Sequence, residues 1–200
     1  MKRYLNILNQ NKNNKMGLKI KKEDANSNKP NLTYNSKNIF VRLHFNHLIK
    51  ESINIIKISK NDKILDFGCG YGELGKRLLG FNIIGYDKRN ELSMIKDYKT
   101  LKPDLIFCLA VFEYFDKKEL INLIKNFKKM NDKLKLVVSM PKENLFSRLG
   151  NYLFGFRKVN TNTKCNHKDV KNILSLYMVL EKEKKIFPGT NEITLWKFKA

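Results

Sequence analysis

The 200-residue sequence is poor in cysteine, proline and tryptophan, and it has no long apolar run. Its three cysteines, at positions 69, 108 and 165, are odd in number and have no metal-like spacing, which gives little support to a disulfide framework or a zinc site. No run approaches the roughly 20 apolar residues of a membrane span, and positions 1–15 lack the apolar segment of a signal peptide. We therefore expect a cytoplasmic protein.

Acidic residues are also scarce, with 19 against 40 basic ones, so the formal net charge is +21. A basic surface attracts polyanions, which keeps nucleic acid open as a partner. Only six of the basic residues are arginine, however, and nucleic-acid sites favour arginine for bidentate contacts. The excess of lysine and asparagine is what an A/T-rich genome imposes on any surface, so nucleic acid is not the favoured partner.

Glycine is gathered in one stretch, which reads ILDFGCGYGELG from Ile64 to Gly75. An apolar run ends in Asp66, passes through glycines, and resumes with helical spacing from Glu73 to Leu79. This pattern predicts a strand, a tight loop and a helix. Ligands of parallel α/β sheets bind just beyond the carboxyl ends of the strands, where glycine exposes bare backbone.

The charges around this loop indicate what it binds. Residues 70–75 fit the G-x-G-x-x-G pattern of nucleotide phosphate sites, but Asp66 and Glu73 would repel a phosphate. Carboxylates suit a ligand that carries an ammonium and a sulfonium. Asp87 follows the next predicted strand, Asn82 to Tyr86, where a carboxylate can accept hydrogen bonds from ribose hydroxyls.

ILDFGCGYGELG followed by IIGYDKR resembles the first two motifs of class I S-adenosylmethionine-dependent methyltransferases. The resemblance covers residues 39–200 and implies an α/β fold: a Rossmann-like, doubly wound, seven-stranded and mostly parallel sheet with an antiparallel last strand. It also implies S-adenosyl-L-methionine as cofactor, with the glycines against its methionine part, Asp66 near its ammonium and Asp87 on its ribose. The implied cofactor-binding residues are Asp66, Gly68, Cys69, Gly70, Gly72, Asp87, Lys88, Leu109 and Ala110.

The chain divides into two parts. Residues 1–37 form a basic, Asn/Lys-rich segment with few apolar residues, which we expect to be a poorly ordered arm. Residues 38–200 form the domain, which begins with an amphipathic helix up to Ile56. His44 and His47 share a face of that helix, where they either bind a metal or a proton, or are half-buried helix residues. By resemblance this region borders the acceptor, with Tyr34, Arg42 and His44 as candidate contacts.

The remaining elements follow from apolar periodicity and turn residues. After Asp87 we expect a short or broken helix over residues 90–96 and a short third strand, with Asp97 in the place of the family's adenine-binding acid. Further strands are predicted at 104–110 and 134–140, and helices at 116–130 and 169–180. A final antiparallel hairpin is predicted from strands at 182–187 and 192–199.

The acceptor side gives weaker signals. The run DLIFCLAVFEYF resembles the family's fourth motif, and the absence of Asn-Pro-Pro-Tyr and Pro-Cys argues against DNA base methylation. Glu113 either accepts a proton from the acceptor or caps the next helix. His167 either accepts a proton over the site or fixes the loop before the last helix. No metal is predicted.

We expect residues 141–166 to form an insertion, with an aromatic, apolar run at 144–158. It either covers the acceptor or docks on the core as a short helix. With Arg148, Arg157 and Lys158 beside it, such a cover would suit a lipid or aromatic acceptor at an anionic membrane surface.

The sequence thus predicts a methyltransferase that acts on a small-molecule, lipid or glycan-linked acceptor by in-line methyl transfer. Because the sulfonium already supplies a good leaving group, holding the nucleophile in line is the chief task of such an enzyme. The alternatives are an RNA methyltransferase and a non-catalytic module that retains the cofactor pocket.

Overall fold

The computed structural model describes residues 39–142, 163–186 and 190–200. The predicted N-terminal arm, Tyr34 and most of the predicted insertion lie outside these ranges. In the ranges described, no helix is long and apolar enough to cross a membrane.

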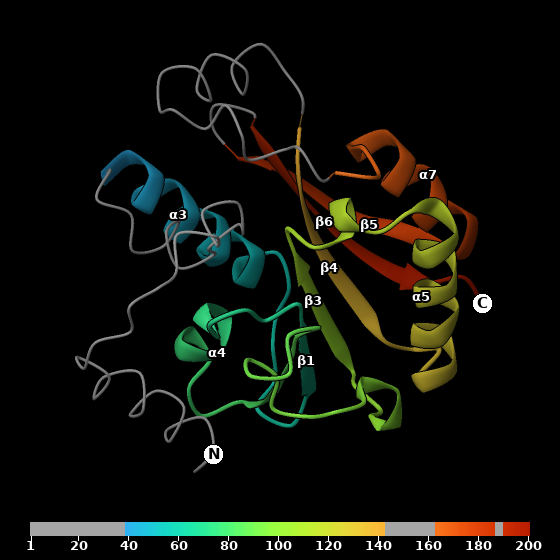
Figure 1. The fold of residues 1–200 in the computed structure, drawn as a ribbon, viewed down its shortest axis with the longest axis horizontal. Helices are drawn as coiled ribbons and strands as arrows, with labels where there is room; N and C mark the ends of the chain where they lie inside the picture. Colours follow the sequence, from blue (N-terminus) through green and yellow to red (C-terminus); the bar gives the residue numbers. More distant parts are fainter. Residues whose placement is uncertain (1–38, 143–162, 187–189) are drawn as a thin grey trace, which may run out of the picture.

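A six-stranded sheet with the order β2-β1-β3-β4-β6-β5 forms the centre of the molecule (Figure 1). Strands β2, β1, β3 and β4 are parallel, β6 pairs antiparallel with β4, and β5 pairs antiparallel with β6. The mostly parallel α/β sheet with antiparallel last strands confirms the predicted fold class. The strands are β1 (Lys63–Phe67), β2 (Asn82–Tyr86), β3 (Leu105–Leu109), β4 (Lys135–Pro141), β5 (Met178–Ile186) and β6 (Asn191–Phe198).

Helices cover both faces of the sheet, as Figure 1 shows. On one face α3 (Ile39–Asn54) and α4 (Glu73–Arg77) pack over a cluster that includes Ile64, Phe107 and Leu195. On the other face α5 (Lys117–Met130) and α7 (His167–Tyr177) pack over Leu65, Ile106 and Trp196. Because successive strand residues point to opposite faces, a strand covered on both sides supplies both clusters, which is why β3 is apolar along its length.

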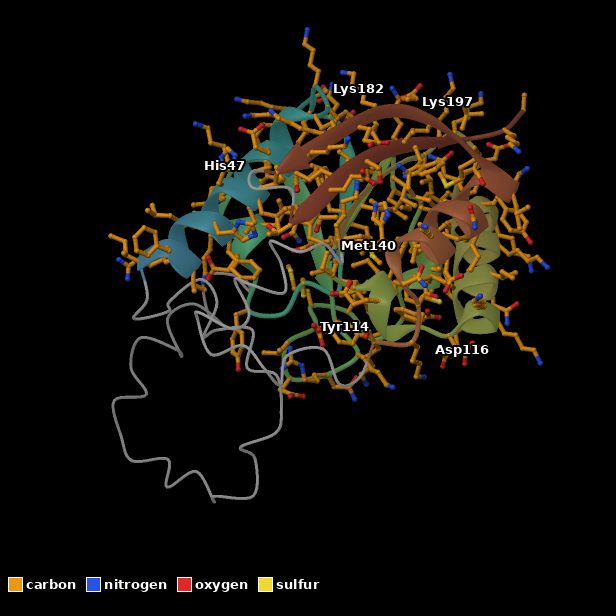
Figure 2. All side chains as sticks on the ribbon, turned by 90° about the horizontal axis from the view of Figure 1, so that it is seen from above. His47, Tyr114, Asp116, Met140, Lys182 and Lys197 are labelled. Carbon is orange, nitrogen blue, oxygen red and sulfur yellow. The ribbon has the colours of Figure 1, made fainter. Side chains whose placement is uncertain are left out.

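The parallel strands end at one edge of the sheet, which we call the rim. β1, β2, β3 and β4 reach it with their carboxyl ends, and the antiparallel β6 begins there, since Pro141 pairs with Asn191. The helix after the β3 loop begins at the same end, with Asp116 as its cap. Asp116 and Glu119 form a capping box there, at 2.8 Å in both directions. In Figure 2 Asp116 lies beside α5, while Lys182 and Lys197 lie beside the β5–β6 hairpin on the opposite side of the molecule.

The segment between Asp87 and Pro103 differs from the prediction. The helix over 90–96 and the third strand are wrong: this described segment has turns and a short 3₁₀ helix, η2 (Tyr98–Thr100). The Met94 amide donates to the Gly85 carbonyl at 2.9 Å, so the chain crosses the outer edge of β2 without adding a strand to it. The sheet of the described residues therefore has six strands rather than seven.

The C-terminal boundaries also shift. The helix ends at Tyr177 rather than at position 180, and β5 begins at Met178, where it pairs with Phe198. Met178 is buried, and its pairing with β6 ends the helical periodicity earlier than the sequence pattern predicts.

Candidate functional site

The glycine loop after β1 is held open by left-handed backbone. Gly68, Gly70 and Gly72 have φ values of 79°, 50° and 73°, a region that other residues rarely adopt. The Gly68 and Cys69 amides both donate to the carbonyl of Tyr86, at 2.7 and 3.0 Å, so the loop is anchored to the end of β2. These bonds leave a short stretch of bare backbone on the rim between β1 and β2.

Asp66 lies beneath this loop, near the end of β1. Its side chain is buried, and its Oδ2 atom has no hydrogen-bond partner among the described residues. Burial, helped by the neighbouring carboxylate of Asp87, raises the pKa of Asp66 to about 7. A buried carboxyl group without a partner is costly, and a cationic ligand would supply the missing interaction.

Asp87 connects the glycine loop to the end of β2. Its Oδ2 accepts the Gly70 amide at 2.9 Å, and its Oδ1 accepts both the backbone amide of Arg89 at 3.0 Å and the Arg89 Nε at 3.2 Å. The Arg89 guanidinium also lies 5.9 Å from the centre of the Tyr71 ring, on the loop. Lys88, between them in sequence, is exposed.

The end of β3 closes the other side of the loop. Leu109 and Ala110 are half-buried there, and Ala110 has a φ of 55°, the one non-glycine residue with positive φ among those described. Its amide donates to the carbonyl and hydroxyl oxygens of Ser139 on β4, at 3.0 and 3.1 Å. A Cβ atom at Gly68 would lie 2.4 Å from Cγ2 of Val111, so the two loops are in close contact. The structure thus brings Asp66, the glycines, Asp87, Leu109 and Ala110 together at adjacent strand ends.

Glu113 lies in η3 (Phe112–Tyr114), the 3₁₀ turn after β3. It is 5% exposed, its Oε2 has no partner among the described residues, and burial raises its pKa to about 7. It does not cap the following helix, because Asp116 has that role. Its backbone carbonyl accepts the amides of Lys164 and Cys165, at 2.7 and 3.4 Å, which fixes the start of α7 beside this turn.

His167, the first residue of α7, contacts a buried carboxylate. Its Nε2 atom hydrogen-bonds Oε2 of Glu192, whose side chain is 1% exposed. Lys142 and Lys171 also contact Glu192, at 2.8 and 3.2 Å. Burial disfavours the charged form of Glu192, but these partners hold its pKa well below the usual range. Burial lowers the pKa of His167, although Glu192 favours its protonated form.

The other residues predicted for the site do not form one cluster. His44 hydrogen-bonds Oδ1 of Asn191 at 2.9 Å and so reaches the rim, whereas the half-exposed His47 lies 3.9 Å from Glu51. The two histidines therefore do not form one site.

Arg42 is half-buried on α3. Asp97 caps η2 by accepting the Lys99 amide at 2.9 Å. Cys69 is half-buried with Sγ 3.6 Å from the carbonyl of Leu92, and burial raises its thiol pKa.

Sequence reasoning missed Glu192, Asn191, Lys142 and Arg89. A signal for Glu192 was present. Alternation along β6 places it on the same face as the buried Trp196, where a carboxylate needs charged partners. The lysine at 142 gave no such signal, because it lies just beyond a strand end among many other lysines.

The described residues contain no group of three or more His, Cys, Asp or Glu side chains placed to hold a metal ion. The strand-end site instead offers two acidic side chains, one of them without a partner, beside bare backbone. This chemistry fits a ligand with an ammonium group and a ribose, as S-adenosylmethionine has.

Comparison with known structures agrees with the α/β fold. The fold is similar to that of magnesium protoporphyrin IX methyltransferase (ChlM) from Synechocystis PCC 6803 with bound SAH, at 15% identity and a TM-score of 0.63, over 86% of this chain and 98% of that one. It is also similar to the N-methyltransferase NodS from Bradyrhizobium japonicum WM9 in complex with S-adenosyl-L-homocysteine, at 16% identity and a TM-score of 0.58, over 82% and 90%.

A third similar structure is the small RNA methyltransferase HEN1, at 16% identity and a TM-score of 0.58, over 78% of this chain and 26% of that one. Comparison with curated proteins finds no match by sequence. Residues 40–176, however, match the family model described as a methyltransferase domain. With the glycine loop, the two acids and the sheet topology on the same residues, the chain belongs to the class I S-adenosylmethionine-dependent methyltransferases.

Proposed function

We propose that this methyltransferase acts on a small-molecule, lipid or glycan-linked acceptor that carries a hydroxyl or amine, by in-line methyl transfer. The donor half of the proposal depends on one observation, the buried Asp66 carboxyl whose Oδ2 has no partner beside the glycine loop. S-adenosylmethionine supplies a methyl group on a sulfonium, whose leaving group is a neutral thioether.

The residues of the chain have separate tasks in this proposal. Asp66 attracts the donor's ammonium, and the backbone of Gly68, Gly70 and Gly72 allows close approach. Asp87 accepts the ribose hydroxyls in place of the half-exposed Arg89 side chain, while its bond to the Gly70 amide keeps the loop in shape. Lys88, Leu109, Ala110 and Cys69 complete the walls of this pocket. The enzyme then holds the nucleophile in line with the methyl group, which is catalysis by proximity.

The acceptor half lies at the neighbouring strand ends. Glu113 and His167 are the candidate proton acceptors there, and both are half-buried or buried rather than solvated. Burial raises the pKa of Glu113 to about 7 and lowers that of His167, so an ionised Glu113 carboxylate or a neutral His167 imidazole suits an acceptor with a hydroxyl or an amine. ChlM and NodS, two proteins of similar fold, are described as methyltransferases of a porphyrin and of nitrogen, respectively, which supports a small acceptor here.

For a lipid acceptor we propose that the protein is cytoplasmic and contacts an anionic membrane. Three apolar side chains at the start of α3 are exposed: Ile39 by 51%, Phe40 by 67% and Leu43 by 57%. Together with the net charge of +21, they support contact with an anionic surface. Co-sedimentation with vesicles tests this part: binding to phosphatidylserine vesicles and not to phosphatidylcholine vesicles is expected, and equal recovery with both contradicts it.

Incubation of the full chain with methyl-labelled S-adenosylmethionine and fractionated cell extract tests the acceptor. Label in the lipid or small-metabolite fraction is the expected result. Label confined to protein or RNA refutes this acceptor class. The matched control is Asp66→Asn, a near-isosteric change that should remove the labelling by weakening donor binding.

RNA is the second candidate acceptor, supported by the net charge and by the fold similarity to HEN1. Phosphate contacts make such binding fall steeply with salt. Methylation of bulk RNA that drops steeply as salt is raised would favour it, and no label in RNA at low salt would exclude it. If no fraction is labelled although S-adenosylhomocysteine binds, the chain is a non-catalytic cofactor-binding module.

A further inference from the structure

The cluster around Glu192 lies at the rim, next to the donor site. Leu109, the last residue of β3, pairs with Ser139, and β4 continues past it to Met140 and Pro141, which pair with Glu192 and Asn191. β6 is two strands from β3, and strands are about 4.8 Å apart, so the cluster lies on the order of 10 Å from the end of β3. An acceptor that lies between the donor site and this cluster would span about that distance.

The start of α7 is fixed at this place by backbone bonds. The amides of Lys164 and Cys165 donate to the Glu113 carbonyl at 2.7 and 3.4 Å. Asn166 caps α7 through the Asp169 amide at 2.9 Å, and His167 is the first residue of the helix. His167 is therefore held between the turn after β3 and the start of β6.

The charges of the cluster are balanced without a proton on His167. Lys142 contacts Oε1 of Glu192 at 2.8 Å, and Lys171 contacts Oε2 of Glu192 at 3.2 Å and Glu183 at 2.7 Å. Two ammonium groups thus already face two carboxylates. An additional charge on the imidazole would have to be desolvated, because the His167 side chain is only 15% exposed.

The hydrogen bond to Glu192 also selects the tautomer. An ionised carboxylate only accepts, so Nε2 of His167 must carry the hydrogen that it donates. In the neutral ring Nδ1 then holds the free lone pair. Nδ1 makes no hydrogen bond to another described residue, and it lies across the ring from Glu192. Such an arrangement, a base oriented by a second group, is the general design of a proton acceptor.

We propose that Glu192 is a positioning residue that fixes His167 with Nε2 protonated and Nδ1 as the proton acceptor of the reaction. The inference rests on the proposed function, because it requires a hydroxyl or amine nucleophile. As the nucleophile bonds to the methyl carbon, the carbon–sulfur bond breaks with its electron pair on sulfur, and the nucleophile's proton passes to Nδ1. Glu192 and the two lysines keep their charges throughout, and the carboxylate stabilises the imidazolium that forms.

Nitrogen-15 NMR of the full chain, labelled on histidine, tests the tautomer without any acceptor. The chain has three histidines, so His167→Gln assigns the signal of interest and keeps a donor toward Glu192. A neutral ring with hydrogen on Nε2 at pH 7.5 is expected. Hydrogen on Nδ1, or an imidazolium at that pH, overturns the inference while the methyltransferase assignment stands.

Glu192→Gln tests the positioning, with Glu181→Gln as the matched control. Glu181 also lies between two lysines, Lys135 at 3.4 Å and Lys197 at 3.2 Å, but contacts no histidine. Loss of Glu192 should mix the tautomers and lower the His167 pKa further, since the carboxylate favours the charged ring. The control variant Glu181→Gln should leave the tautomer and the pKa of His167 unchanged. Equal effects of the two variants would mean that Glu192 is merely structural.

The rate test uses the labelled extract fraction as acceptor. Wild-type methylation should fall on the acidic side of the pKa that NMR gives for His167, because the base must be neutral. His167→Gln should lower the rate about 100-fold and abolish this fall of the rate at low pH, the acidic limb of the profile. Glu192→Gln should lower the rate about tenfold and shift the acidic limb to lower pH. An acidic limb that persists in His167→Gln refutes the role of this histidine.

Discussion

Asp66 links the stability of the fold to donor binding, and replacing it by asparagine separates the two. In the ligand-free protein its carboxyl group is 4% exposed and Oδ2 has no described partner. Burial and the Asp87 carboxylate raise its pKa from 3.8 to about 7. The side chain therefore weakens the fold increasingly as pH rises from about 4 to 7, and a cation bound beside it would offset this cost.

The magnitude follows from the two pKa values. In the unfolded chain the carboxyl ionises near 3.8, while the folded chain holds the proton up to about pH 7. Stability thus falls as pH rises through this window, and the loss is complete above pH 7. At about 1.4 kcal/mol for each unit of pKa, the full loss is about 4 kcal/mol. Asparagine avoids it but buries an amide that lacks partners, which costs about 1–3 kcal/mol at every pH.

Urea unfolding at pH 5 and pH 8.5 separates these contributions, because the amide cost cancels between the two pH values. About a third of the ionisation cost is already present at pH 5. Relative to wild type, Asp66→Asn should therefore gain about 2–3 kcal/mol of unfolding free energy between pH 5 and pH 8.5. Asp132→Asn removes the same charge from an exposed loop at the opposite end of the sheet and serves as the control. A gain equal to that of the control would refute the reasoning.

Calorimetry with S-adenosylhomocysteine provides the second measurement. Its ammonium favours the ionised carboxylate, so wild-type affinity should fall by up to about tenfold for each pH unit below 7. Asp66→Asn should bind about ten- to a hundredfold more weakly at pH 8 and lose this pH dependence. Wild-type affinity that is the same at pH 6 and pH 8 would show that the ligand does not meet this carboxylate.

Two other substitutions test the loop and the ribose contact. Gly68→Ala combines a φ of 79° with a Cβ atom 2.4 Å from Cγ2 of Val111, so it should destabilise the fold by about 2–4 kcal/mol in urea unfolding. The control is Gly80→Ala, at a φ of 90° in open space, which should cost about 1–2 kcal/mol. Equal losses would mean that the contact with Val111 is not tight. Asp87→Ala should weaken S-adenosylhomocysteine binding by about tenfold or more in calorimetry and leave the Gly70 amide without its acceptor, and unchanged affinity would count against the ribose contact.

The proposed donor half of the site could be placed from the sequence because its residues are local in the chain. Asp66 and the glycines occupy one strand–loop–helix unit, and Asp87 follows the next strand, which pairs directly with β1. Hydrophobic runs, glycine spacing and charge are enough to place such a unit. The start of the helix at Asp116 was predictable for the same reason, since Asp116 and Glu119, which form its capping box, lie within four residues.

The segment from Asp87 to Pro103 could not be predicted in this way. Polar and apolar residues are mixed in it without a clear period, and their positions depend on contacts with β2. The Ser93 hydroxyl accepts the Asp87 amide at 3.2 Å, and Sδ of Met94 lies 3.3 Å from the Gly85 amide. These contacts satisfy the edge of β2 locally. A strand there would have required a longer extended run than the sequence supplies.

The proposed acceptor half is assembled from segments that are far apart in the chain, and this explains why sequence reasoning missed Asn191 and Glu192. His44 comes from α3, Glu113 from the turn after β3, His167 from α7, and Asn191 and Glu192 from β6. Asn191 and Glu192 reach the two histidines because β6 pairs antiparallel with β4 and therefore begins at the edge where the parallel strands end. Adjacent β6 residues point to opposite faces, so Asn191 meets His44 on the α3 side and Glu192 meets His167 on the α7 side. The hairpin that closes the sheet thus supplies polar partners to a histidine on each face, next to a donor site whose own acids come from the other half of the sheet.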